Sequence, residues 1–426
     1  MDSRSLARRC VARAVVCLWA VFMLPAMAMA ANTTFPIAPV AVRSALKAAW
    51  QKHPRYQASE ARLVASRARL DAASQPLYNP EVEFAADKEG ADRSTSLGIN
   101  LTLDLTGKRR VRQDAAISRI DLATTEARLR RRDFVQLWLS SWAELQTAQR
   151  RVDTGQRRLS LIYRFAELAI KQFEAGDISG LERDLAQLAR VEAQADQSQL
   201  DADRAQAEAR FRNVGGIPEL AALMQLPTGS LSTPEAGVAV AIEQLPEWQV
   251  AQAEALATER DVSVARSNRR PDPTIGLRGG RIDYGPVQDN VVGLSVSIPL
   301  FVRNSYRAEI VAAQADADAA QAEAQRVRLE VGSERRRAID SYRVTHAAWT
   351  RWQASRGTDI ERRTSLLERL WQQGELSTAD YLLQLKQTLD TQLAGAELEA
   401  RLWQSYADYL AATGQLERWA GMEQTP

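Results

Sequence analysis

The feature that most restricts the fold of this chain is an internal duplication. Three short motifs of the first half return in the second half, in the same order and at nearly constant separation. The matched segments are residues 53–57 with 245–249, 79–80 with 272–273, and 173–179 with 371–377. Each half is therefore predicted to form one copy of the same unit, which is a helix, two strands and a long helical hairpin.

The duplication and the segments around it divide the chain into four predicted parts. Residues 1–30 begin with several Arg residues, continue with an apolar run and end on a small-x-small motif, a pattern typical of a cleaved secretory signal peptide. The first structural repeat is expected over residues 31–214. Clustered Gly and Pro predict an inter-repeat linker over residues 215–240, so the second repeat and the C-terminal tail occupy residues 241–426.

Composition excludes several classes of function. The whole chain has 55 Lys and Arg against 53 Asp and Glu, so no strong field favours nucleic acid as a partner. Both cysteines, Cys10 and Cys17, lie in the signal peptide, which leaves the mature chain without thiols. The two histidines, His53 and His346, are far apart and are expected to cap or pack helices. We therefore predict no enzyme activity, no cofactor and no metal site.

Two segments alternate apolar and polar residues with a period of two, which predicts β-strands. They are residues 97–105 and 292–300. Weaker patterns at residues 82–86 and 275–277 are predicted to pair with them as two hairpins, through polar loops over residues 87–93 and 283–289. A soluble sandwich would alternate as well, but strands of about 9 to 11 residues with one polar face match transmembrane strands.

The helical segments are too long for a compact domain. Residues 108–175 contain no proline, and residues 305–373 are similar. At about 1.5 Å per residue, each segment allows a helix of roughly 100 Å, which would project as a stalk. Near the far ends of these segments, apolar residues follow the three-and-four spacing of coiled-coil seams. An ordinary coiled coil would show the same spacing.

Four strands per chain leave two open sheet edges. Unpaired backbone groups in hydrocarbon cost several kcal/mol each, so such a sheet must close with copies of itself. Two chains would give a barrel whose interior is filled by side chains, whereas three chains give twelve strands and a water-filled lumen. The predicted fold class is therefore α+β, and three chains are favoured if the protein conducts.

The duplicated layout, which covers essentially the whole mature chain, resembles the TolC-like outer-membrane factor family. The resemblance implies a trimeric outer-membrane β-barrel of four strands per chain, twelve in total, continued by a long periplasmic α-helical barrel. Within the family, residues 104–110, His53-Pro54 and residues 410–414 are similar to the CzcC-like heavy-metal efflux branch. The resemblance implies an outer-membrane channel subunit of a tripartite efflux system, which exports divalent cations of the cobalt, zinc and cadmium type from the periplasm. Its implied partners are two further copies of the chain, a periplasmic adaptor protein, an inner-membrane pump of the RND type and outer-membrane lipid.

The same resemblance implies two kinds of functional residue. The turns between paired helices are expected to dock the adaptor, and this set is Gly176, Asp177, Ser179, Gly374, Glu375 and Ser377. These glycines could equally serve only to close the turns. Asp380 matches a family position that narrows the pore, although a lone Asp on a helix is usually solvated. Leu383 stands where relatives can carry a second acid, so at most one acidic ring is expected.

Three other functions stay open from the sequence. The same duct could serve drug efflux or type I protein secretion instead of metal export. The chain could also be a non-conducting periplasmic coiled-coil scaffold, but that function leaves the alternating strands unexplained. An enzyme is the weakest alternative, because no catalytic constellation is present.

Overall fold

The computed structural model describes residues 37–90, 92–224, 231, 239–355 and 360–423. All of these residues belong to one unit, Ile37–Pro426. The predicted signal peptide and its two cysteines lie outside the described residues, as does most of the second half of the predicted linker. The proposed limits of the repeats therefore remain predictions.

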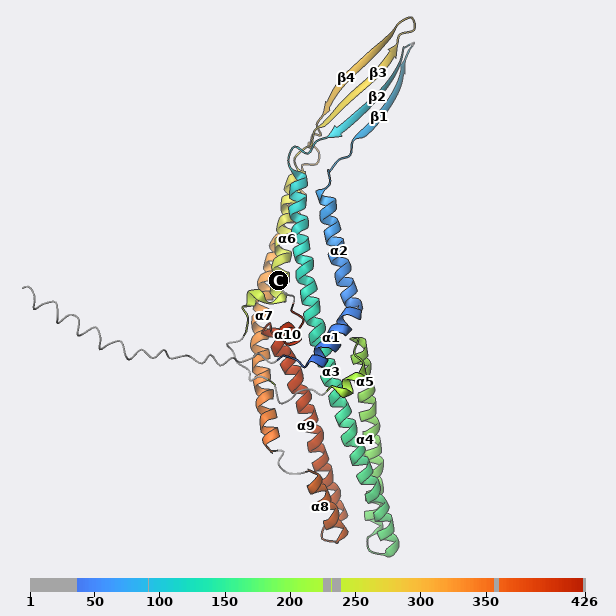
Figure 1. The fold of residues 1–426 in the computed structure, drawn as a ribbon, viewed down its shortest axis with the longest axis vertical. Helices are drawn as coiled ribbons and strands as arrows, with labels where there is room; N and C mark the ends of the chain where they lie inside the picture. The colour runs from blue at the N-terminus through green and yellow to red at the C-terminus, as the bar shows by residue number, and fades with distance from the viewer. Residues whose placement is uncertain (1–36, 91, 225–230, 232–238, 356–359, 424–426) are drawn as a thin grey trace, which may run out of the picture. The chain divides into compact units, whose positions relative to one another are not determined.

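The strands form a four-stranded antiparallel sheet in the order β1-β2-β3-β4 (Figure 1). Their bounds are Glu81–Glu89 for β1, Asp92–Thr102 for β2, Thr274–Asp283 for β3 and Gln288–Ser297 for β4. Both predicted hairpins are confirmed. The hairpins are joined because β2 pairs with β3, with Ile99 opposite Leu277 and Leu101 opposite Ile275. One sheet thus contains strands of both repeats.

The predicted strand ends were wrong in two ways. Apolar alternation continues to residues 105 and 300, but the paired strands end at Thr102 and Ser297, because the chain leaves the ladder there. The polar segment 87–93, which was expected as a loop, is instead largely strand, and Asp87 pairs with Ser94, whereas residues 284–287 of the second expected loop do lie between β3 and β4. Pairing in a sheet uses backbone groups, so a polar side chain does not end a strand.

The sheet has one apolar face and one polar face. Along β2, Leu97, Ile99 and Leu101 point to the more exposed side, while Ser96, Gly98 and Asn100 alternate with them on the other. Cross-strand partners extend both faces over the other strands, because paired residues lie on the same side of a sheet. The apolar face is covered by no other part of the described chain: Phe84 is 71% exposed and Val292 is 79% exposed.

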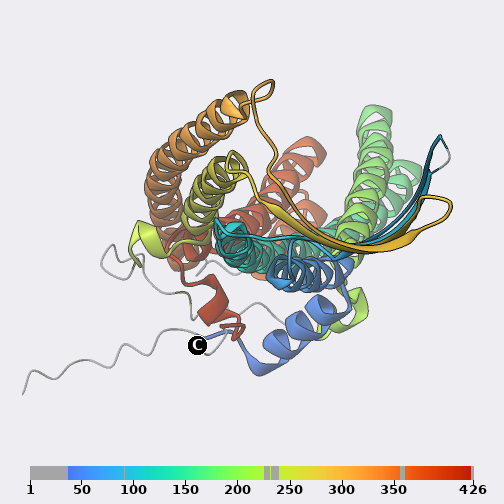
Figure 2. The same ribbon diagram turned by 90° about the horizontal axis from the view of Figure 1, so that it is seen from above.

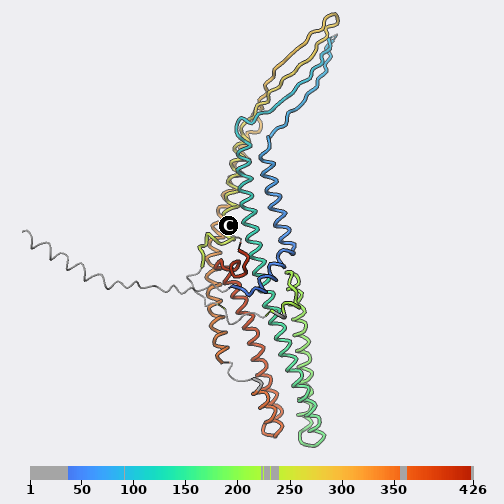
Figure 3. Tube along the Cα trace, in the orientation of Figure 1, coloured from blue at the N-terminus to red at the C-terminus, as the bar shows by residue number. Residues whose placement is uncertain are grey.

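The helices run away from one end of the sheet (Figure 3). In the first repeat they are α1 Val40–Lys52, α2 Pro54–Ser74, α3 Lys108–Ala175 and α4 Gly180–Asn213, and α5 Pro218–Leu223 lies in the predicted linker. In the second they are the 3₁₀ helix η3 Ile242–Gln244, α6 Pro246–Asn268, α7 Arg307–Ser355, α8 Ile360–Gln372, α9 Thr378–Ala412 and α10 Leu416–Trp419. Viewed end-on, α7, α6, α3 and α4 follow one another along a curved layer, in which each contacts the next (Figure 2).

The first long helix agrees with its prediction. α3 is continuous over 68 residues, and a glycine with positive φ lies directly before and directly after it, Gly107 at 72° and Gly176 at 83°. The second long segment is described as α7 and α8, and residues 356–359 between them lie outside the described part. Its continuity is therefore not described.

The main core lies where the two repeats meet at mid-length. Its largest buried side chains are aromatic, and they include Trp138 and Trp142 of α3 and Trp403 and Tyr406 of α9. His53 lies at the edge of this core, where its Nδ1 accepts a hydrogen bond from the Arg55 backbone N–H at 3.1 Å. This histidine caps α2, as the sequence predicted.

Candidate functional site

The first candidate site is the turn between α3 and α4, residues 176–179, which we call the first tip. Gly176 has φ 83°, and its N–H donates to the Phe173 carbonyl at 3.0 Å, which ends α3. Ser179 then caps α4: its hydroxyl accepts from the Glu182 N–H at 3.2 Å, and the Glu182 carboxylate accepts from the Ser179 N–H at 2.9 Å. This reciprocal pair is a capping box.

The turn between α8 and α9, residues 374–377, repeats this geometry, and we call it the second tip. Gly374 has φ 74°, and its N–H donates to the Trp371 carbonyl at 3.0 Å. Ser377 caps α9, and its hydroxyl accepts from the Asp380 N–H at 3.1 Å. Both tips therefore share one construction, a glycine in the left-handed region followed three residues later by a capping serine.

The predicted docking residues lie on the outside of these two tips. Gly176, Asp177, Ser179, Gly374, Glu375 and Ser377 are all exposed. A Cβ atom added at either glycine would meet nothing within 4 Å, so backbone conformation and not crowding selects glycine there. The structure thus brings the six residues together at one end of the helices, and their docking role remains a prediction.

Asp380 has a second role that the prediction did not include. It occupies the position in the second tip that Glu182 occupies in the first, and the Ser377 hydroxyl donates to its Oδ2 at 2.7 Å. The carboxylate is exposed and lies in the first turn of α9. Hydrogen bonds from the Ser179 backbone and hydroxyl hold the pKa of Glu182 below its usual value, which favours the charged cap at neutral pH.

A shared core holds the two tips side by side. Phe165 of α3 stacks on Tyr381 of α9 with ring centroids 4.7 Å apart, and Trp371 of α8 lies 4.4 Å from Phe165. Trp371 also donates its indole N–H to the Thr378 hydroxyl at 3.2 Å. Burial raises the pKa of Tyr381 to about 12, so this ring stays neutral. The core fixes how the tips are presented, because it contains residues from both helical hairpins.

Ion pairs on the surface of the hairpins reinforce this arrangement. Lys386 of α9 lies 2.7 Å from Glu192 of α4, and Arg158 of α3 lies 2.9 Å from Asp196 of α4. The first pair is half-exposed, so its contribution to stability is small. It nevertheless links a helix of the second repeat to one of the first.

A buried polar cluster joins the sheet to the helices. Lys108, the first residue of α3, lies 2.9 Å from Asp272, and their side chains are 8% and 2% exposed. The Tyr78 hydroxyl donates to the same carboxylate at 2.8 Å. Asp104 accepts the N–H of Lys108 at 2.8 Å and so caps α3. Sequence reasoning missed Asp272, although its place directly before the proline that precedes β3 repeated the Asn79-Pro80 motif.

The described residues give no sign of a helical membrane span or of a metal centre. Among them, no helix is both long enough and apolar enough to cross a membrane. In the same part of the chain, no three His, Cys, Asp or Glu side chains lie close enough together to hold a metal ion.

Comparisons with known proteins agree with this geometry. Residues 45–216 match the family model "Outer membrane efflux protein". The chain is 25% identical over 248 residues to the cobalt-zinc-cadmium resistance protein CzcC of Cupriavidus metallidurans, covering 56% of this chain and 58% of the relative. It is 26% identical over 278 residues to the nickel-cobalt-cadmium resistance protein NccC of Alcaligenes xylosoxydans xylosoxydans, covering 63% of this chain and 62% of the relative. The matches therefore span about three fifths of these curated relatives.

The fold itself matches solved structures over more of the chain. The Campylobacter jejuni CmeC outer membrane channel superposes with a TM-score of 0.73 at 14% identity, covering 88% of this chain and 86% of that one. The long helices, the four-stranded sheet and the paired tips thus form the same fold as that channel, and the predicted fold class is confirmed. Residues 45–216 are thus similar to the outer membrane efflux protein family, and the fold of the described chain is TolC-like.

Proposed function

We propose that this chain is the outer-membrane channel subunit of a tripartite efflux system, and that its passengers are divalent heavy-metal cations. Three copies join their sheets into a twelve-stranded barrel, and the helices of the three copies extend the wall into the periplasm. The partners are a periplasmic adaptor and an inner-membrane pump of the RND type.

The observation that supports this function best is the unfinished sheet. β1 and β4 are edge strands, and each has one side without a partner strand in the described chain. The apolar face beside them is bare, with Leu294 74% exposed. In a membrane the open edges must pair with strands of further copies of the chain. The apolar face must meet lipid. The polar face then surrounds a lumen that is wide enough for water at twelve strands.

The adaptor is expected to dock at the two tips. The turns are exposed, have the same backbone geometry and are held side by side by the shared aromatic core. Because each tip glycine leaves open space around it, a partner helix can approach the backbone closely. Asp380 lies in the first turn beyond the second tip, where its carboxylate would contribute one acidic ring to the pore entrance of a trimer.

The proposal that the cargo is metal cations depends on the two relatives that are named for resistance to cobalt, zinc, cadmium and nickel. A hydrated cation needs no binding site in order to cross a water-filled lumen. Selection of the metal is therefore assigned to the pump or the adaptor and not to this chain.

Deletion of the gene tests the function. A deletion strain should become sensitive to cobalt, zinc and cadmium, and a copy of the gene on a plasmid should restore tolerance. Unchanged tolerance to these metals, with raised sensitivity to drugs or loss of a secreted protein, would assign the duct to another cargo. Recovery of the protein as a soluble periplasmic monomer would instead support the scaffold and would refute the channel.

A further inference from the structure

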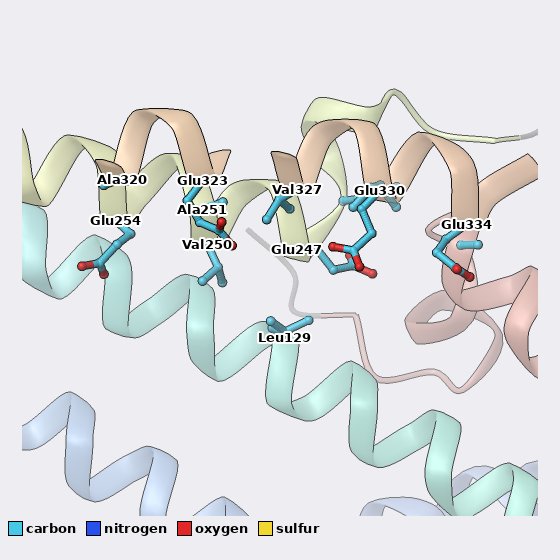
Figure 4. A pocket seen from close by; sticks show the side chains of 13 residues that line it. Leu129, Glu247, Val250, Ala251, Glu254, Ala320, Glu323, Val327, Glu330 and Glu334 are labelled. Carbon is cyan, nitrogen blue, oxygen red and sulfur yellow. The ribbon is translucent and has the colours of Figure 1, made fainter. Parts of the chain in front are cut away.

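A groove at mid-length of the helices has no part in the function proposed above. It lies between α3, α6 and α7 and has a volume of about 540 Å³. Its floor is aliphatic and is built from Leu129 of α3, Val250 of α6 and Val327 of α7 (Figure 4). Sites for small organic molecules typically have volumes of about 300–1,000 Å³ and mostly apolar walls. The groove therefore has the size and the floor of such a site.

The rim of the groove is acidic. Its carboxylates come from Glu247 and Glu254 of α6 and from Glu323, Glu330 and Glu334 of α7, and Figure 4 shows them at the groove. No Lys or Arg side chain is among the described residues that line it. The apolar floor and the acidic rim therefore match a ligand that has an apolar body and a positive charge.

Two of these carboxylates have capacity for a further partner. Glu254 forms no ion pair with any residue in the described part of the chain. Glu247 pairs with Arg132 through Oε1, but its Oε2 is buried without a hydrogen-bond partner. The charge of this carboxylate adds to the negative potential of the rim. Among the described residues, Glu330 pairs with the exposed Arg326, a type of pair that contributes little and that a ligand can displace.

We propose that this groove binds amphiphilic organic cations. The aliphatic floor buries the apolar body of the ligand, and the carboxylates of Glu247 and Glu254 face its charge. A hydrated metal ion fits less well, because it would leave the apolar floor in water. A neutral compound would gain nothing from the negative charge of the rim. The site is separate from the tips and from the sheet, so it is a property of the channel wall that does not depend on the identity of the exported cargo.

Equilibrium dialysis of the full-length protein in an uncharged detergent tests this site. The probe is tetraphenylphosphonium, and the neutral comparison is triphenylphosphine oxide, which has a similar apolar body. We expect the cation to bind more tightly than the oxide. Glu254→Gln should weaken binding of the cation about 3- to 5-fold, the range for one partly exposed ion pair, and leave the oxide unchanged. Glu259→Gln, on the exposed side of the same helix, is the matched control and should change neither.

A second variant examines the cavity itself. Ala320 lines the groove, and Ala320→Phe should fill it and weaken both probes by more than about 10-fold at an unchanged melting temperature. Equal binding of the cation to the original protein and to Ala320→Phe would mean adsorption to micelles and would overturn the proposal. Binding by dissociated chains but not by the assembled oligomer would show that a second copy covers the groove, which would overturn it as well. Metal export by a protein that does not bind tetraphenylphosphonium would refute this site and leave the proposed function intact.

Discussion

The two tip glycines allow docking to be separated from turn closure. Both adopt the left-handed conformation, with φ of 83° at Gly176 and 74° at Gly374. An Ala there costs about 1–2 kcal/mol in backbone strain, or about 2–4 kcal/mol for the pair. Asn costs less, because it adopts this conformation more readily, yet its side chain is larger. Since an added Cβ meets nothing within 4 Å in the free chain, no steric term opposes either change.

Adaptor docking and turn closure therefore predict opposite rankings of export for two double variants, the Asn pair and the Ala pair, in which both tip glycines are replaced. If the tips dock the adaptor, the Asn pair should reduce export more than the Ala pair, although the Asn pair should melt at the higher temperature. If the glycines only close the turns, the Ala pair should be the worse in both respects. The tip core should keep every variant folded, because burial of each large side chain in it contributes about 1.5–3 kcal/mol.

The assay uses a deletion strain that carries each variant on a plasmid. Metal tolerance and retained cobalt report export, and the oligomer band on unheated gels reports assembly. A Gly176→Asp and Gly374→Asp double variant should assemble normally but export nothing, because it adds charge as well as size at the contact. Full export by this double variant, or an Ala pair that exports worse than the Asn pair at equal assembly, would refute tip docking.

Three further predictions concern single charged groups. Asp380→Asn keeps an acceptor for the capping serine, so it should leave the melting temperature unchanged and lower cation selectivity in planar bilayers; unaltered selectivity would remove Asp380 from the pore entrance. Lys108→Met leaves the buried carboxylate of Asp272 without its ion-pair partner and should cost about 3–5 kcal/mol in stability, measured as a lower melting temperature of the assembled protein. Adding Asp272→Leu should restore most of the lost stability. The folded pKa of Glu182 lies below its ordinary value of 4.5, so its capping contribution is present above that value and is lost as the pH falls through the folded pKa. The protection factors of the backbone amides in the first turn of α4 should therefore fall only in acid. Ser179→Ala should remove that pH dependence.

Local patterns predicted the elements well where local physics decides them. The proline-free segment between Gly107 and Gly176 predicted α3, because a helix is built from local hydrogen bonds and a glycine lies at each of its ends. The limits of β2 and β4 were missed, since a strand ends where its partner strand ends, and both of these strands pair with β3. The Ser-x-x-acid spacing at both tips was readable as a capping signal and would have shown the second role of Asp380.

The groove and the buried pair could not be predicted in the same way. Leu129, Val250 and Val327 belong to three helices of two repeats, and no spacing along the chain relates them. Lys108 and Asp272 are likewise far apart in sequence. Only the packing of one repeat on the other brings these residues together, so a periodic pattern in the sequence cannot predict them.

The pairing of β2 with β3 has a consequence for how such a wall could arise. Each repeat contributes one hairpin, and the junction inside the chain resembles the junction that must form between chains. A half-length ancestor with a single hairpin could have closed the same cylinder from six copies. Fusion of two halves would free alternate positions around the ring to diverge, so that Tyr381, where the first repeat has Arg183, would occur three times around the ring and not six.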